Sequence, residues 1–160
     1  MVKNCTIYSS KEYEEILAYL EGDGMRDVSD GLSDMEVPDK SDLEVKIFER
    51  NYFEGNLRVS LKKQFERGDS FSSLIRGTWN FFETIETKHK TQKKKLVNHI
   101  LECKTAIGIR ADPVFTLTDK RLDCVFRITE MCDGIIFNGS EMIDRNGNLI
   151  LDKSGNTELA

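Results

Sequence analysis

The residues best placed to do chemistry are three polar side chains that follow two apolar runs of the sequence. Asp112 comes directly after the run Thr105 to Ala111, and Asn138 and Ser140 follow the run Ile135 to Phe137. Because ligands gather at the carboxyl ends of parallel strands in open α/β sheets, these three are our candidate ligand-binding residues. The alternative, which we favour, is turn chemistry, since Asp and Asn side chains hydrogen-bond their own loops.

A calcium loop near the end of the chain is the second candidate. Side chains with oxygen atoms alternate there at the spacing of an EF-hand loop, at Asp144, Asn146, Asn148 and Asp152. An EF-hand needs glycine at its sixth position and glutamate at its twelfth, where this chain has Leu149 and Gly155. Asn146-Gly147 between apolar flanks instead predicts a two-residue type I′ hairpin turn. We therefore predict no metal site.

Signatures of nucleophilic catalysis and of cofactor binding are absent from the sequence. His89 and His99 lie too far apart for a metal-ligand pair, and the cysteines include no Cys-x-x-Cys. Cys124 and Cys132 fall on or beside the apolar face of one predicted helix, which favours buried small hydrophobes. Neither a nucleophile elbow nor a phosphate-binding glycine loop occurs. We predict no catalytic residue and no cofactor, and we lean away from an enzyme while leaving the question open.

Two segments of opposite charge could serve a partner. Residues 21–44 carry nine acidic residues against Arg26 and Lys40, with three glycines and a proline, and predict a mobile acidic surface loop at 21–42. A lysine run follows later, at Lys88, Lys90, Lys93, Lys94 and Lys95. Lysines at a helix start oppose the helix dipole slightly, so helix stability does not explain them. They predict either a contact with an anion, the acidic loop or a partner, or a solvated helix start.

Length and composition predict a single α/β domain over residues 1–160. The chain has 39% hydrophobic residues, enough for one packed core, and a net charge of -5. An acidic chain is a poor match for nucleic acid or an anionic membrane, and no apolar run approaches the roughly 20 residues of a membrane helix. The start shows no signal peptide, so we expect a cytoplasmic protein with reduced cysteines. The oligomeric state is left open.

Periodicity places the candidate residues on a mixed sheet with helices packed on it. Alternation predicts strands over 2–8, 43–47, 57–61, 141–143 and 149–151, and continuous apolar runs predict buried strands at 105–111 and 135–137. Helical spacing predicts helices over 10–20, 70–85, 91–103 and 118–133, with Ser9 or Ser10 capping the first and Thr118 the last. The last helix has the length of a right-handed crossover between parallel strands. We find no internal repeat and expect a frayed tail after Asp152.

The stretch from Leu96 to Leu151 resembles the N-terminal α/β module of a bacterial family of unknown function. Three pieces carry the resemblance: IGIRADPVF, the helix ending in CDGIIFNGS, and MIDRNGNLIL. The alternating segments LEVKIFER and NLRVSLKK also fit that module, in which a helical domain of unknown function usually follows. The resemblance implies the α/β fold and a bacterial cytoplasmic origin. It implies no activity, cofactor or site residue.

These observations favour a non-enzymatic binding or protein-interaction module with a protein partner. One alternative is a small-ligand-binding or enzymatic domain that uses the strand-end edge near Asp112. The other is an immunity-type accessory protein, whose acidic loop would suit a basic partner.

Overall fold

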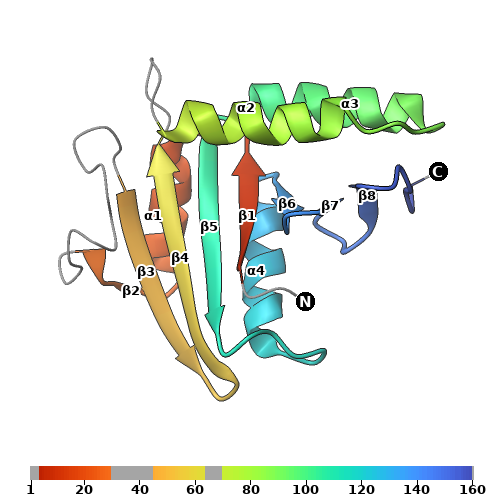
Figure 1. Ribbon diagram of the computed structural model, residues 1–160. Coiled ribbons are helices and arrows are strands. Elements are labelled where there is room, and N and C mark those ends of the chain that lie inside the picture. The colour runs from red at the N-terminus through yellow and green to blue at the C-terminus, as the bar shows by residue number, and fades with distance from the viewer. Residues whose placement is uncertain (1–3, 30–44, 64–69, 160) are drawn as a thin grey trace.

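The computed structural model describes residues 4–29, 45–63 and 70–159. In chain order their elements are β1 (Asn4–Ser9), α1 (Tyr13–Gly22), β2 (Arg26–Asp27), β3 (Val45–Tyr52), β4 (Gly55–Lys63), α2 (Ser70–Glu83), α3 (Lys90–Glu102), β5 (Thr105–Asp112), α4 (Lys120–Met131), β6 (Ile135–Phe137), β7 (Glu141–Ile143) and β8 (Leu149–Asp152). The α/β fold class is confirmed, with helices packed on one open sheet and a C-terminal hairpin (Figure 1). No helix of the described ranges is long and apolar enough to cross a membrane.

The sheet has the strand order β2-β3-β4-β5-β1-β6-β7-β8, and every neighbouring pair is antiparallel. The predicted crossover between parallel strands is confirmed in direction, but the two strands are not neighbours. The two strands do run in the same direction, because both are antiparallel to β1, but β1 lies between them. Strands that run in the same direction need a crossover connection such as α4, whether or not another strand lies between them.

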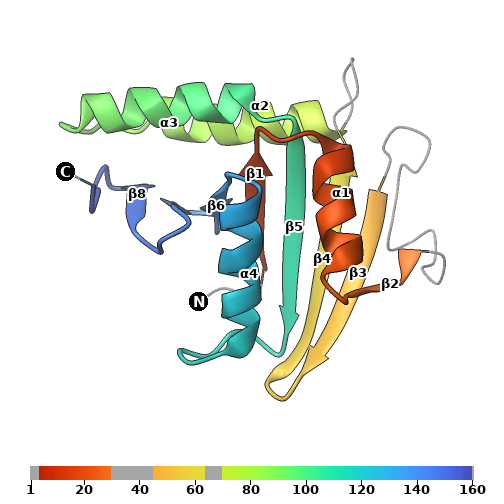
Figure 2. The same cartoon turned by 180° about the vertical axis from the view of Figure 1, so that it is seen from behind.

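Helices cover the two faces of the sheet unequally. On one face α1 and α4 pack over the core formed by side chains such as Ile7, Val59 and Ile109 (Figure 2). On the other face α2 and α3 pack over a second core that includes Tyr8, Ala106 and Ile135. In the ribbon views α2 and α3 lie across one end of β1, β4 and β5 (Figure 1).

Strand β4 shows how alternation produces these two surfaces. Leu57, Val59 and Leu61 have no exposed surface, while Arg58 and Ser60 between them point to the other face and are partly exposed. Burial of one such aliphatic side chain contributes about 1.5–3 kcal/mol, which fixes the strand's register against its neighbours. The face to which Arg58 and Ser60 point is the one that α2 and α3 cover in part. In the orientation of Figure 1, none of the four helices covers the lower half of this face, and its surface is polar.

Both helix caps predicted from hydroxyl residues are wrong. The residue before α1 is Glu12, and Ser9 instead donates its hydroxyl to the Cys132 carbonyl at 2.6 Å. The residue before α4 is Asp119 and not Thr118, because the Asp119 carboxylate accepts a hydrogen bond from the Arg121 amide at 2.9 Å. A tertiary contact therefore occupies the Ser9 hydroxyl, whereas α4 is capped locally, one residue later than predicted.

The C-terminal hairpin is confirmed, but its turn is not type I′. A type I′ turn needs positive φ at both central residues, and of Asn146 and Gly147 only Gly147 has one, at 83°. The Asp144 carboxylate organises the loop by accepting hydrogen bonds from the Asn146 and Asn148 amides, both at 2.9 Å.

The same turn recurs at Asp152, which the sequence analysis did not predict. The segments DRNGN and DKSGN start at Asp144 and Asp152, and Gly155 has the same φ of 83° as Gly147. The Asp152 carboxylate accepts from the Ser154 and Asn156 amides at 2.9 Å, and these bonds hold the pKa of Asp152 below its ordinary value. The tail is not frayed here: Thr87 donates its hydroxyl to the Gly155 carbonyl at 2.6 Å.

The acidic segment is described only at its start. Residues 21 and 22 end α1, and Arg26–Asp27 form β2, which pairs with β3. These residues are therefore ordered elements and not the start of a loop. Residues 30–44 lie outside the described residues, so the predicted mobile loop stays a prediction there.

Candidate functional site

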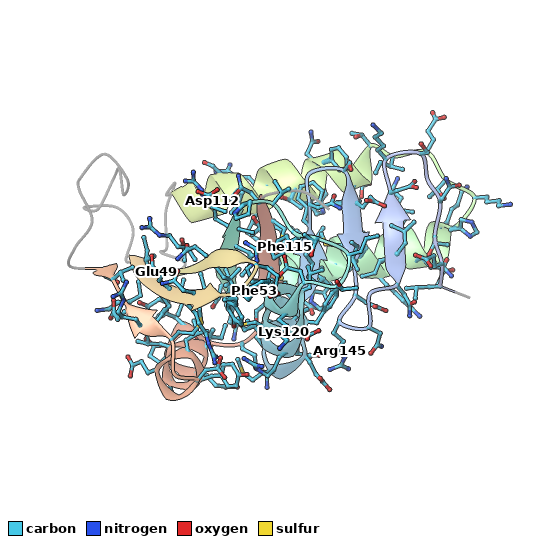
Figure 3. The ribbon with its side chains drawn as sticks, turned by 90° about the horizontal axis from the view of Figure 1, so that it is seen from below. Glu49, Phe53, Asp112, Phe115, Lys120 and Arg145 are labelled. Carbon is cyan, nitrogen blue, oxygen red and sulfur yellow. The ribbon has the colours of Figure 1, made fainter. Side chains whose placement is uncertain are left out.

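Two loops meet at one end of the sheet and form a surface that we call the tip. One is the β3–β4 turn, Phe53-Glu54, and the other is the connection of residues 113–119 between β5 and α4. The Lys120 amide at the start of α4 donates to the Glu54 carboxylate at 2.7 Å, which joins the β3–β4 turn to the residue that follows the second loop. Figure 3 looks onto this end of the molecule, with Phe53 and Phe115 labelled on the two loops and Lys120 at the start of α4.

Arg121 holds the tip together from inside. Its side chain and that of Asp119 are both 0% exposed, and the guanidinium donates to both carboxylate oxygens of Asp119 at 2.6–3.1 Å. The same guanidinium donates to the carbonyls of Asn56, Pro113 and Val114 at 3.1, 2.7 and 3.1 Å. It therefore ties the start of β4 to the 113–119 connection. A buried charge is tolerated only when it is paired and hydrogen-bonded in this way.

Two further contacts set the shape of the tip. The Phe115 ring lies 5.3 Å from the Arg121 guanidinium carbon and is itself buried. Gly55 has a φ of 144°, and a Cβ there would lie 2.5 Å from the Pro113 Cδ atom. Only glycine allows the hairpin to approach the connection this closely.

Large apolar side chains project from this rigid base into solvent. Phe53 is 103% exposed and Leu117 is 97% exposed, and Val114 is 50% exposed. Scattered exposed apolar residues are ordinary on protein surfaces. Here, however, all three stand on the two loops that Arg121 locks together, whereas the other large exposed apolar residue of the described chain, Leu101, lies on α3.

The candidate ligand residues are not gathered into one site. Asp112, exposed at the end of β5, lines a polar hollow of about 360 Å³ with Glu49, Asn56, Arg58 and Arg110, which we call the sheet hollow (Glu49 and Asp112 are labelled in Figure 3). Asn138 borders a separate space of about 20 Å³ among apolar side chains. The two residues therefore contribute to different surfaces.

Asn138 and Ser140 form the local turn that the alternative interpretation describes. The Asn138 side-chain oxygen, Oδ1, accepts from the Ser140 amide at 3.1 Å and from the Glu141 amide at 2.9 Å. Its amide nitrogen donates to the Glu141 carboxylate at 3.0 Å. These contacts occupy the polar atoms of the Asn138 side chain, so its geometry is that of a turn between β6 and β7.

The sheet hollow lies over part of a row of four charged side chains that are opposite one another on neighbouring strands. We call this row the arginine row. Arg26 on β2 is opposite Glu49 on β3, Glu49 is opposite Arg58 on β4, and Arg58 is opposite Arg110 on β5. Residues opposite one another in antiparallel strands share a face, so all four project from the uncovered polar surface. The Glu49 carboxylate accepts from Arg26 through Oε1 and from Arg58 through Oε2 at 3.2 Å.

The cysteines do not form an activated nucleophile. All four are free, and burial raises the pKa of Cys5 and of Cys103 to about 12 and that of Cys132 to about 11. They remain protonated thiols at neutral pH, as expected for buried hydrophobes. Within the described ranges no group of three His, Cys, Asp or Glu side chains is arranged to hold a metal ion.

The lysine run borders a groove of about 590 Å³ between the end of α2 and the start of α3. Lys90, Lys93 and Lys94 line it together with Glu83 and Glu86, and Lys93 donates to the Ile85 carbonyl at 3.0 Å. Within the described chain none of the five lysines forms an ion pair. The predicted contact with the acidic segment concerns residues 21–44, of which only 21–29 are described, and it stays a prediction.

Sequence reasoning missed the tip and the arginine row for different reasons. Arg121 follows a helix cap and looks like an ordinary exposed helix residue, and only the cap spacing Asp119-x-Arg121 hints at a local pair. The arginine row joins positions as far apart as Arg26 and Arg110, and it depends on strand order and register, which the pattern of each strand does not contain.

No family model matches the chain, and no match is found among the curated proteins or the solved structures. The resemblance to an α/β module of unknown function therefore stays a prediction.

Proposed function

We propose that this chain is a protein-interaction module that docks a protein partner through the tip. The observation that carries the proposal is the pair Phe53 and Leu117, fully solvent-exposed on two loops that a buried arginine holds in place. Interfaces draw most of their affinity from a few large side chains that enter pockets of the partner. A rigid base lowers the entropy that binding costs, because the anchors are already positioned.

The charges around the tip favour a protein over a lipid surface. Glu54, Asp112 and the exposed Lys120 flank the apolar residues, so the tip has no excess of positive charge, and the whole chain has a net charge of -5. Anionic membranes bind segments rich in lysine and arginine beside their apolar residues, and acidic groups repel them. The partner is therefore expected to offer an apolar pocket with a polar rim.

The proposed module needs no catalytic group. Among the described residues burial raises the pKa values of the cysteine thiols, and no group of three His, Cys, Asp or Glu side chains is arranged to hold a metal ion. The immunity-type alternative is a special case of the same function, in which the partner is a toxin. Its original support was the acidic loop, which lies mainly outside the described residues.

Site-specific photo-crosslinking tests the proposal. A photoreactive phenylalanine analogue replaces Phe53 in one sample and Leu101 in another, since Leu101 is 57% exposed on a different surface. The protein crosslinked through position 53 is then purified, and its affinity for the wild type, Phe53→Ala and Leu101→Ala is measured. We expect Phe53→Ala to weaken binding at least about tenfold, as for an interface anchor, and Leu101→Ala to have no effect.

Two results contradict the proposal. One is equal affinity of the purified partner for the wild type and for a Phe53→Ala, Leu117→Ala double variant. The other is a concentration-dependent dimer, seen by sedimentation of the isolated chain, that the double variant abolishes, since the tip would then bind a second copy and not a different protein.

A further inference from the structure

The arginine row breaks the alternation of charge across the sheet at Arg110. Arg26, Glu49 and Arg58 alternate in sign from strand to strand, and the next position in the row repeats the positive charge. Like charges directly opposite one another destabilise a sheet. On its other side Arg110 is opposite Asn4 of β1, which carries no charge. The stability of the fold therefore does not explain an arginine at this position.

Glu49 cannot compensate Arg110. Its two carboxylate oxygens already accept from Arg26 and Arg58, and only 11% of its side chain is exposed. These bonds, with the one from Arg26 the strongest, also keep the pKa of Glu49 below its ordinary value, so the carboxylate stays charged. Arg110 is exposed and has no hydrogen bond or ion pair to any other described side chain.

The surface beside the two arginines leaves space for a small molecule. The neighbouring row consists of Ser60, Gly108 and Thr6, and their short side chains leave space above the strands. The row on the other side contains Asn56 opposite Asp112. The hollow of about 360 Å³ is lined only by polar or charged residues, so it suits a small polar ligand and not an apolar one.

We propose that Arg58 and Arg110 bind the phosphate group of a small phosphate monoester in the sheet hollow. Three arginines and one glutamate leave the row with two excess positive charges, and a phosphate monoester carries nearly two negative charges at neutral pH. Guanidinium groups bind phosphate oxygens through paired, charge-assisted hydrogen bonds. The phosphate supplies the negative charge that the alternation lacks between Arg58 and Arg110.

Asp112 and Asn56 indicate what else the ligand carries. Both are in the row beside the arginines, and the Asp112 carboxylate would repel a bare phosphate. A hydroxyl group on the ligand would donate a hydrogen bond to that carboxylate and offset the repulsion. The ligand class is therefore a hydroxylated phosphate monoester. The proposal does not rest on the tip or on the proposed protein partner, although Asp112 borders both surfaces.

Titration followed by NMR tests the proposal on the full chain, through the side-chain N–H signals of the arginines. The probes are inorganic phosphate, glycerol 3-phosphate, acetate and a short acidic peptide. We expect glycerol 3-phosphate to shift the Arg58 and Arg110 signals saturably and to bind more tightly than the other three. Arg110→Gln and Arg58→Gln should each raise its dissociation constant about tenfold or more, because each removes hydrogen bonds from a charged group.

Arg145→Gln is the matched control. Arg145 is exposed on the β7–β8 turn, at the opposite side of the view in Figure 3 from Glu49, and pairs with Asp133 at 3.5 Å. Its loss should leave the dissociation constant unchanged. An equal effect of Arg145→Gln, shifts that do not saturate, or tighter binding of acetate would each overturn the proposal. Preferential binding of the acidic peptide would also overturn it and would assign the two arginines to a protein partner. Tm measurements on all variants show whether each one is folded.

Discussion

Arg121 and Arg110 place the same type of side chain in two opposite environments within one corner of the molecule. Arg121 has no exposed surface, and Asp119 and three backbone carbonyls satisfy its guanidinium. Arg110 is exposed, faces another arginine across the strand pair and has no partner among the described side chains. The first arginine holds loops together, whereas the second leaves hydrogen-bonding capacity unused. Arg110 lowers the stability of the sheet and has no partner, whereas the cost of burying Arg121 is offset by its partners. Arg110 is therefore the better evidence for a binding site.

The largest effect is expected from removing the buried arginine. Arg121→Met keeps much of the side-chain volume but leaves the Asp119 carboxylate and three carbonyls without their donor. We expect a loss of about 3–5 kcal/mol in the free energy of unfolding, the usual cost of breaking a buried ion pair. Urea denaturation measures it. Arg110→Met is the control and should change stability by less than about 0.5 kcal/mol, so equal losses in the two variants would remove the distinction drawn between them.

Asp119 makes the same pair sensitive to pH. The hydrogen bonds from Arg121 hold the pKa of Asp119 well below its unfolded value of about 4. A carboxylate with a lowered folded pKa stabilises the fold above its unfolded pKa, and this contribution declines as the pH falls below about 4. Asp119→Asn should therefore cost about 3 kcal/mol at pH 7.

The gap between wild type and Asp119→Asn should shrink as the pH falls from about 5 to about 2, because the wild type then loses the same charge. Urea denaturation across this range measures both curves. Glu130→Gln serves as the control, since Glu130 is exposed on α4 and outside the buried pair. A gap that stays constant with pH would show that the charge of Asp119 does not stabilise the tip.

A smaller effect of opposite sign is expected at the unpaired arginine. Arg110→Glu restores the alternation of charge beside Arg58 and should raise stability by about 0.2–1 kcal/mol, the range of a favourable cross-strand pair. The same change should abolish binding of glycerol 3-phosphate. Thermal unfolding at low ionic strength measures the gain, which salt should reduce. A fall in Tm would show that an interaction of Arg110 already stabilises the free protein.

The smallest effect on stability is expected at the exposed end of the tip. Phe53→Ala should change the free energy of unfolding by less than about 0.5 kcal/mol, because the ring is fully exposed. Phe115→Ala, on the neighbouring loop, removes a buried ring and should cost about 3 kcal/mol or more. Urea denaturation of the two variants compares an interface residue with a structural one. A large loss in Phe53→Ala would mean that its ring supports the fold.

Sequence reasoning succeeded where a structure depends on neighbours along the chain. The alternation Leu57, Val59 and Leu61 predicted β4 and its buried face, and the apolar run from Thr105 to Ala111 predicted β5. It was less successful at the ends of elements, where Asp119 replaced Thr118 as the cap and Asp144 reshaped the predicted turn. It overlooked the repeated Asp-x-x-Gly-Asn pattern, although that signal was in the sequence.

The sequence by itself determined the α/β class, most of the strands and helices, and the apolar faces that drive them together, because periodicity of two or 3.6 residues is a local property. Only the tertiary structure placed β1 between β5 and β6, brought Arg58 opposite Arg110, and buried Arg121 against the start of β4. Strand order and register depend on how the buried surfaces of distant segments fit, and a segment's own pattern is compatible with several partners. Asp112 illustrates the difference: the sequence selected it from its place at a strand end, and the fold supplied Arg58, Arg110, Asn56 and Glu49 as its neighbours.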